Sequence, residues 1–204
     1  MNKLLKNICV FTSVILAGGI ALAGPSGVTL GDPAVAGSGC PAGSVDYVLS
    51  PDQTSLSILF DDFITEADAG GRDRKNCDVA IPVKVPSGFS VSVIDMDYRG
   101  YAYLPRRSNA LFSTEYFFAG RRGPRFRKRF KGPMDDEYLV NNTLIATASN
   151  WSPCGKEVIL RSRASVNLNN RRGKELAEMT VDSIDAEVDT RFAIKYYLKW
   201  RRCN

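Results

Sequence analysis

The alternation of apolar and polar residues is clearest over residues 77–104, where it predicts two adjacent strands. Apolar side chains occupy every second position from Cys77 to Val85, the period of a strand with one buried face. Residues 86–88 (Pro-Ser-Gly) then predict a turn, and a second alternation follows. After Val93 the apolar positions shift by one residue without a break, which indicates a β-bulge. Gly100, which lies among tyrosines, predicts a bend or the close approach of another segment.

The same alternation predicts six further strands. They lie at 45–49, 56–60, 110–118, 158–168, 177–188 and 192–200. The first two are expected to form a hairpin, whereas residues 65–76 are polar and predict a loop. No stretch carries a sustained apolar stripe with the 3.6-residue period of a helix. The sequence therefore predicts an all-β fold, an antiparallel β-sandwich or partly open barrel of about eight strands.

The N-terminal residues have the features of an export signal. Lys3 and Lys6 precede an apolar core, and small residues around Ala23 offer a cleavage site. We therefore expect a signal peptide at 1–23, an extended Gly/Pro/Ala arm at 24–39 and a single β domain at 40–204. The protein is accordingly expected to be exported, whether secreted, periplasmic or held at the cell surface.

Four cysteines remain after the predicted signal, and an even number in an exported chain indicates two disulfides. They are Cys40, Cys77, Cys154 and Cys203, and they allow three pairings. We favour Cys40–Cys77 with Cys154–Cys203, because each bridge closes the flank of one half and neither crosses the other. The alternative is a zinc site, but no two cysteines have C-x-x-C spacing and the chain has no histidine. We expect no metal and no cofactor.

Six short motifs surround the cysteines and the predicted turns. They are residues 37–44, 76–77, 85–89, 98–101, 151–155 and 200–203. Together they resemble a secreted domain-of-unknown-function family (number 4360), from about Gly31 to the last residue and with all four cysteines at matching places. The resemblance implies an exported, disulfide-bonded domain found in bacteria and fungi, and it implies no activity and no catalytic residue. The arginine-rich stretch at 121–131 departs from the pattern.

That stretch is the most unusual in composition, since seven of its eleven residues are basic. The basic residues are Arg121, Arg122, Arg125, Arg127, Lys128, Arg129 and Lys131. Without the two lysines of the signal the chain has 25 basic and 22 acidic residues, and outside this stretch 18 basic residues face 22 acidic ones. Clustered arginines favour contact with phosphate, sulfate or carboxylate. We predict a basic loop that binds an anionic polysaccharide or lipid surface, to which Phe126 and Phe130 add apolar contacts.

Two alternatives to this hypothesis involve no ligand. The basic stretch can be a solvated loop whose charge is partly neutralised by the acidic residues that follow at 135–137 (Asp-Asp-Glu). The chain can also be a structural component of an envelope or extracellular matrix. No nucleic-acid-binding motif is present, so the basic stretch alone does not indicate that class of partner.

A third alternative is a carboxylate-dependent enzyme acting on carbohydrate, with Asp61 and Asp62 or Asp95 and Asp97 as the acidic pair. The absence of histidine excludes Ser-His-Asp and Cys-His catalysis. Many tyrosines can form a platform for sugar rings, although strands prefer aromatic residues in any case. They are Tyr98, Tyr101, Tyr103, Tyr116, Tyr196 and Tyr197. Carboxylates facing water on a strand are ordinary, so we favour a non-enzymatic domain.

Overall fold

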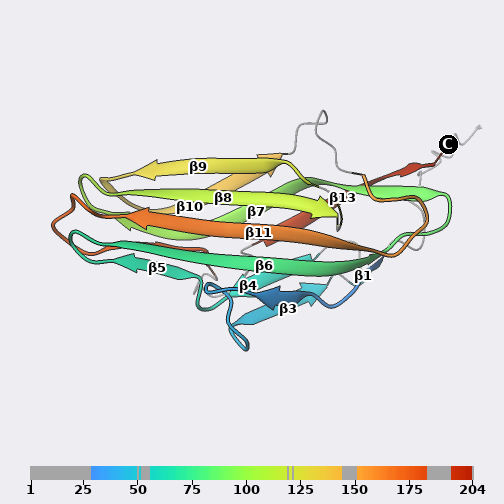
Figure 1. Ribbon diagram of the computed structural model, residues 1–204, viewed down its shortest axis with the longest axis horizontal. Coiled ribbons are helices and arrows are strands. Elements are labelled where there is room, and N and C mark those ends of the chain that lie inside the picture. The colour runs from blue at the N-terminus through green and yellow to red at the C-terminus, as the bar shows by residue number, and fades with distance from the viewer. Residues whose placement is uncertain are drawn as a thin grey trace, which may run out of the picture.

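The structure is a computed structural model in which every described element is a β-strand. It describes residues 29–49, 51, 56–118, 120, 122–143, 151–182 and 194–203. The expected signal peptide at 1–23 lies outside these residues. Figure 1 shows two layers of strands, which confirms the predicted antiparallel β-sandwich.

The front layer in Figure 1 is a six-stranded sheet. Its strands in spatial order are β1 (Thr29–Leu30), β6 (Arg72–Lys84), β11 (Val158–Asn169), β8 (Asn109–Phe118) and β9 (Arg125–Lys131), and β2 (Ala34–Ala36) also pairs with β6. The positions of β6 that were predicted to face inward, from Cys77 to Val83, are all buried. Burial of this apolar row against the second layer is the main source of stability for such a strand.

The back layer is a seven-stranded sheet centred on the long strand β7. Its strands in spatial order are β3 (Val45–Leu49), β4 (Leu56–Phe60), β13 (Ile194–Arg202), β7 (Phe89–Leu104), β12 (Ala177–Thr180) and β5 (Ile64–Ala67), and β10 (Met134–Thr143) also pairs with β7. Tyr197 pairs with Asp95 whereas Leu198 pairs with Val93, so one residue of β7 is left over between them. The predicted β-bulge after Val93 is therefore confirmed.

Thirteen strands are described, and the five that were not predicted are β1, β2, β5, β9 and β10. The prediction of a polar loop over residues 65–76 was wrong. The loop is confined to residues 68–71, because Thr65 and Ala67 alternate inward as β5, and β6 already begins at Arg72. Polar residues extend β6 past its apolar part because β11 continues to supply backbone hydrogen bonds there.

The prediction that residues 121–131 form a loop was also wrong for most of the stretch, because Arg125–Lys131 is strand β9. Phe126 and Phe130 lie opposite inward-facing residues of β8 and pack against the core, with Phe130 itself buried. These two phenylalanines therefore anchor the strand and are not available to a lipid or a sugar ring. Apolar anchors four residues apart, on one side of a strand, explain why so basic a segment joins the sheet.

A buried cluster of hydroxyl groups joins the two layers. The Tyr98 hydroxyl of β7 lies 3.0 Å from Thr114 Oγ1 of β8 and 3.4 Å from Ser162 Oγ of β11, and the Tyr116 hydroxyl donates to it at 2.9 Å. The Tyr98 ring also meets the edge of Phe112 at 4.8 Å. Because buried hydroxyls must find partners inside the protein, this cluster sets how the layers face each other.

Both favoured disulfides are confirmed. Cys40–Cys77 fastens the turn after β2 to β6, with the two Cα atoms 5.5 Å apart. Cys154–Cys203 fastens the end of β13 to the segment that precedes β11, with the Cα atoms 6.2 Å apart. Each half of the chain thus carries one covalent bridge at its flank, as the spacing of the cysteines predicted.

Candidate binding surface on the six-stranded sheet

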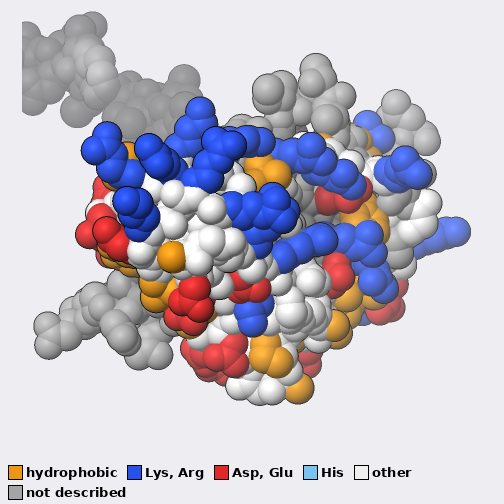
Figure 2. Space-filling view, turned by 60° about the vertical axis from the view of Figure 1, so that its left-hand side comes forward, with side chains coloured by type: hydrophobic (Ala, Val, Ile, Leu, Met, Phe, Trp, Pro, Cys, Tyr) orange, Lys and Arg blue, Asp and Glu red, His pale blue; other side chains and the backbone are white. Residues whose placement is uncertain are grey.

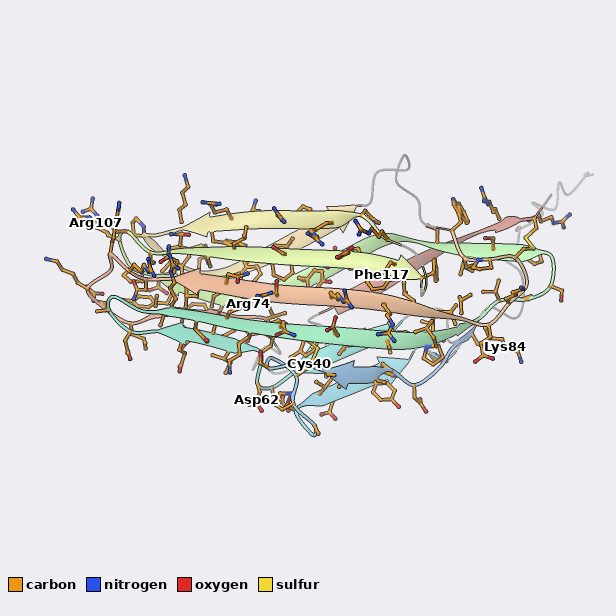
Figure 3. All side chains as sticks on the ribbon, viewed as in Figure 1. Cys40, Asp62, Arg74, Lys84, Arg107 and Phe117 are labelled. Carbon is orange, nitrogen blue, oxygen red and sulfur yellow. A yellow bond between two sulfur atoms is a disulfide. The ribbon has the colours of Figure 1, made fainter. Side chains whose placement is uncertain are left out.

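The outward-facing side chains of β9, β8, β11 and β6 form one continuous surface, which faces the viewer in Figure 3 with Arg74 and Phe117 labelled on it. Directly opposite residues of antiparallel strands point to the same face, so the register places them in rows. From β9 to β6 the four rows are Arg125–Glu115–Arg163–Asp78, Arg127–Ser113–Ser165–Asn76, Arg129–Leu111–Asn167–Arg74 and Lys131–Asn109–Asn169–Arg72. We call this surface the outer face.

The first row is neutral and closed by its own ion pairs. The Arg125 guanidinium lies 2.9 Å from the Glu115 carboxylate, and that of Arg163 lies 2.8 Å from Asp78. The Arg163 guanidinium also sits 5.1 Å from the centre of the Phe117 ring. Cross-strand pairs of opposite charge stabilise a sheet modestly, so this row needs no ligand to account for it.

The other three rows carry positive charge with no acidic residue among them. Arg127, Arg129 and Lys131 of β9 form one rim, and Arg74 and Arg72 of β6 form the other. Within the described part of the chain, none of these five side chains forms an ion pair; Arg72 donates from Nε to Asn169 at 3.4 Å. The outer face therefore carries two cationic rims that the described residues do not neutralise with ion pairs.

Between the rims the outer face is hollowed. A depression of about 700 Å³ lies over the first three rows, because Ser113 and Ser165 at its centre are short and the arginines around it are long. Arg127 lines one side and Arg74 the other, and three strand spacings of ~4.8 Å put the strands that carry them about 14 Å apart. Hydroxyl groups and the Asn167 amide form the polar part of the floor, beside Leu111, and the ion-paired carboxylates of Glu115 and Asp78 line its first-row end. The polar part between the cations suits an anionic ligand rich in hydroxyl groups.

The distribution of charge over the molecule is uneven. Figure 2 shows Lys and Arg side chains gathered across the upper part of the molecule, where β9 and its neighbours lie, with Asp and Glu mostly below and at the left edge. A surface of one sign attracts ligands of the opposite sign and raises their local concentration. The β9 rim of the outer face therefore lies on the positive side of the protein, whereas the β6 rim lies lower in the same view.

The structure divides the seven basic residues that the sequence singled out. Arg125, Arg127, Arg129 and Lys131 all point to the outer face, and Arg125 is occupied by its ion pair with Glu115. Alternation along β9 turns Lys128 away from them, although it is exposed. Three residues of the predicted site, Arg127, Arg129 and Lys131, are thus brought together with their charges available.

The remaining two lie before the strand. Arg122 is exposed, and Arg121 lies outside the described residues. The acidic residues at 135–137 begin β10, and among the described residues they form no ion pair with the basic stretch. The neutralisation considered for a solvated loop is therefore not found within the described chain.

Sequence reasoning missed the second rim and the floor. Arg72 and Arg74 lie about 50 residues before β9, in a stretch that was predicted to be a loop, and Ser113 and Ser165 lie on two further strands. Arg161 and Arg163 alternate with buried residues along β11, and both are exposed. The register that sets these strands side by side cannot be read from any local sequence pattern.

The acidic pairs considered for catalysis lie elsewhere. Asp61 and Asp62 are exposed in the turn after β4, where Figure 3 labels Asp62 at the lower edge of the molecule. Asp97 is half-buried on β7 in the other sheet, and the side chain of Asp95 lies outside the description. None of Asp61, Asp62 and Asp97 lines the depression of the outer face.

Two of the tyrosines hold carboxylates on the seven-stranded sheet. The Tyr101 hydroxyl donates to Asp135 Oδ1 at 2.5 Å, and the Tyr103 hydroxyl donates to Glu175 Oε2 at 2.9 Å. The hydrogen bond to Asp135 is the main cause that raises the pKa of Tyr101 to about 12, and the bond to Glu175 raises that of Tyr103. The predicted tyrosine platform is thus split, since Tyr98 is buried in the core.

The Tyr101 bond should be visible in a pH titration. Because the protonated hydroxyl is the donor, the bond stabilises the fold below the ordinary tyrosine pKa near 10 and is lost as the pH rises through about 12. The difference in absorbance at 295 nm between the wild type and Tyr101→Phe should titrate near pH 12. Asp135→Asn should move this midpoint towards 10. A wild-type midpoint near 10, with the fold intact by circular dichroism, would contradict the assignment.

Within the described residues, no group of three or more His, Cys, Asp or Glu side chains is placed to hold a metal ion. The same part of the chain contains no helix long and apolar enough to cross a membrane.

Comparison with known proteins gives a family and a relative. Residues 26–203 match the family described as "Domain of unknown function (DUF4360)". An "Uncharacterized secreted protein" of Arthroderma benhamiae is 33% identical over 181 residues, covering 87% of this chain and 70% of the relative. The resemblance drawn from the sequence motifs is confirmed. Export is confirmed as well, since the relative is named a secreted protein and both disulfides are formed.

Among solved structures, that of TmCBM61 in complex with beta-1,4-galactotriose is similar over 83% of this chain and 88% of that chain. The TM-score is 0.29 and the sequence identity is 11%. A likeness this weak carries no argument about the ligand of the present chain.

Proposed function

This chain belongs to the family described as "Domain of unknown function (DUF4360)", whose description names no ligand, and from that premise we propose that it is a secreted, non-enzymatic domain that binds an anionic polysaccharide on its outer face. The observation that carries the proposal is the pair of cationic rims on either side of a polar floor. Arg127, Arg129 and Lys131 lie on one side and Arg74 and Arg72 on the other, with no acidic residue in their rows.

The floor favours a polysaccharide over a lipid surface. Binding to a membrane is strengthened by apolar side chains that project into the lipid beside the cations. Phe126 and Phe130, the apolar residues closest to the rim in sequence, pack inward instead. Ser113, Ser165 and the neighbouring asparagines offer hydroxyl and amide groups, which pair with sugar hydroxyls while the arginines take carboxylate or sulfate.

The proposal is tested by measuring binding of the oxidised protein to dextran sulfate and polygalacturonate, with neutral dextran as the uncharged polymer, at low and high salt. The rim variant is Arg74→Gln, Arg127→Gln and Arg129→Gln together. Partly screened contacts of ~0.5–1 kcal/mol each, three in all, predict a loss of affinity of about 10- to 150-fold. Because charge drives the contact, wild-type binding should also weaken steeply as salt is raised.

The matched control removes the same charge elsewhere. Lys84→Gln, Lys128→Gln and Lys156→Gln together take three exposed cations from outside the rims, and affinity should change by less than about twofold. Equal losses in the two triple variants would mean that net charge, and not the outer face, governs binding. Failure of the wild type to bind either polyanion at low salt would overturn the proposal. The cations of β9 have a further role to consider, because β9 is an edge strand and charges on an edge strand keep the sheets of two molecules from pairing. Size-exclusion chromatography of the rim variant shows whether it self-associates for that reason.

A further inference from the structure

A second cationic groove lies at one end of the sandwich, separate from the outer face. Three connections meet there: residues 105–108 between β7 and β8, residues 132–133 between β9 and β10, and residues 170–176 between β11 and β12. They lie at the left end in Figure 1, and Figure 3 labels Arg107 at that end. The groove between them has a volume of about 970 Å³. Sequence analysis attached no function to any of these connections.

The rim of this end groove is cationic. Arg106, Arg107, Arg172 and Lys174 line it and are exposed, and within the described chain none of the four forms an ion pair. Clustered guanidinium groups favour bidentate contact with carboxylate or sulfate. The rim therefore has the chemistry of an anion site, and it is contributed by two segments more than 60 residues apart in sequence.

The groove also contains two carboxylates that its own tyrosines hold in place. Asp135 accepts from Tyr101, and Glu175 accepts from Tyr103. Each carboxylate has further lone pairs beyond the one its tyrosine uses, so it can still accept from a ligand hydroxyl. Cations together with fixed hydrogen-bond acceptors suit a ligand that carries both an anionic group and hydroxyl groups.

One part of the groove's lining, which we call its floor, is apolar. Tyr103, Pro133 and Met134 contribute to it, whereas the Leu104 side chain is itself fully buried. Binding sites for small ligands combine such a floor with a few fixed polar groups, and an aromatic ring offers a flat face to a sugar ring. A free inorganic anion would not use this floor, whereas a sugar bearing an anionic group uses the floor and the rim together.

The connections around the groove are fixed before any ligand arrives. The Ser108 side chain and backbone both bond to the Pro105 carbonyl, and the Gly132 amide donates to Ser108 O at 3.1 Å. The Asn170 amide nitrogen bonds to three carbonyl oxygens, one of them that of Glu175 at 2.7 Å. A site ordered in advance loses less conformational entropy on binding.

Arg107 adds an independent indication. Its backbone φ is 72°, a left-handed conformation that residues other than glycine, asparagine and aspartate rarely adopt. Glycine adopts a positive φ in a turn without steric cost, so it is the residue expected at such a position when the side chain has no role. Strained backbone conformations cluster at functional sites, and this one places a long cationic side chain at the rim of the groove.

We propose that the end groove is a second binding site, for a sugar unit that carries a carboxylate or sulfate. Arg106, Arg107, Arg172 and Lys174 take the anionic group, the Tyr103 side of the floor takes the ring, and Asp135 and Glu175 accept from hydroxyls. The site stands independently of the outer face, because the two surfaces share no lining residue.

The test uses the ¹⁵N-labelled oxidised protein and trigalacturonate, with maltotriose as a neutral trisaccharide and sodium sulfate as a bare anion. Backbone amide shifts should move at the non-proline residues of 103–108, 132–135 and 172–175. Arg106→Gln with Arg172→Gln should weaken trigalacturonate binding at least tenfold, while the rim variant of the outer face should change it less than twofold. These outcomes together would support a second site.

Three results would overturn the proposal. Shifts confined to the outer face would mean that the groove is not a site. Unchanged affinity in the Arg106→Gln and Arg172→Gln variant would mean that its cations take no part. If sulfate bound as tightly as trigalacturonate, the sugar ring would contribute nothing and the groove would not be a sugar site. Both substitutions fall on exposed side chains, and the dispersion of the same spectra verifies that the variant is folded.

Discussion

Replacing Cys40 and Cys77 together with alanine is expected to lower the free energy of unfolding by about 5 kcal/mol. The bridge closes a loop whose ends are 37 residues apart, for which loop-closure entropy predicts about 4 kcal/mol. Both cysteines are also 1% exposed within the core, so removing their sulfur atoms adds about 1 kcal/mol of lost packing. Equilibrium denaturation in urea under non-reducing conditions measures the change.

The second disulfide is the matched control. Cys154–Cys203 closes a longer loop, of 49 residues, but Cys154 is exposed and Cys203 is only half-buried. Replacing this pair with alanine should therefore cost about 4 kcal/mol, nearly all of it from loop closure. If the second pair proved the more costly, burial of the first bridge would not contribute as argued. A loss well under 2 kcal/mol for both would show that the unfolded chain retains structure around its cysteines.

The parts of the fold that alternate cleanly could be predicted from the sequence. Strands with an uninterrupted inward apolar row, such as β6 and β8, were predicted to within about five residues, because burial of that row decides the strand. The bulge after Val93 was visible for the same reason, since a shift of phase is a shift of the buried side. The disulfide pairing followed from spacing along the chain.

The parts that failed are those that depend on a neighbouring strand. The segment around β9 looks like a loop when only its charges are counted, and becomes a strand only because Phe126 and Phe130 fit beneath β8. Likewise Arg72 extends β6 only because Asn169 lies opposite. Such pairings join residues far apart in sequence, and no local period contains them.

The candidate site was predicted in part for the same physical reason. One rim was evident from composition, because Arg127, Arg129 and Lys131 are consecutive on one side of a single strand. The opposite rim and the floor come from three other strands, and the depression exists only because serines rather than longer residues occupy the centre of one row. The end groove is harder still to find, since it is assembled from three turns.

Replacing Gly100 with alanine is expected to lower the free energy of unfolding by about 3 kcal/mol. A Cβ atom there would lie 2.7 Å from the Tyr138 hydroxyl oxygen and closer still to the carbonyl oxygen of Thr180. The carbonyl belongs to the backbone and cannot rotate away. The Tyr138 hydroxyl donates to that carbonyl at 2.5 Å, and burial raises its pKa, so it remains protonated. Thermal or urea unfolding of the variant measures the cost.

Comparison with Tyr138→Phe separates the two contacts. That variant loses only the hydroxyl and its bond to Thr180 O, at about 1–2 kcal/mol. The double variant should be at least as unstable as Gly100→Ala alone, because the clash with the carbonyl persists. Recovery of wild-type stability would place the whole clash on the hydroxyl.

The effect of Gly100→Ala should also reach the outer face. The Tyr138 ring packs 4.8 Å from Phe130, the buried anchor of β9, so displacing Tyr138 loosens the strand that carries one cationic rim. Gly100→Ala should therefore weaken polyanion binding under conditions where the variant is still folded, although it lies in the other sheet and bears no charge.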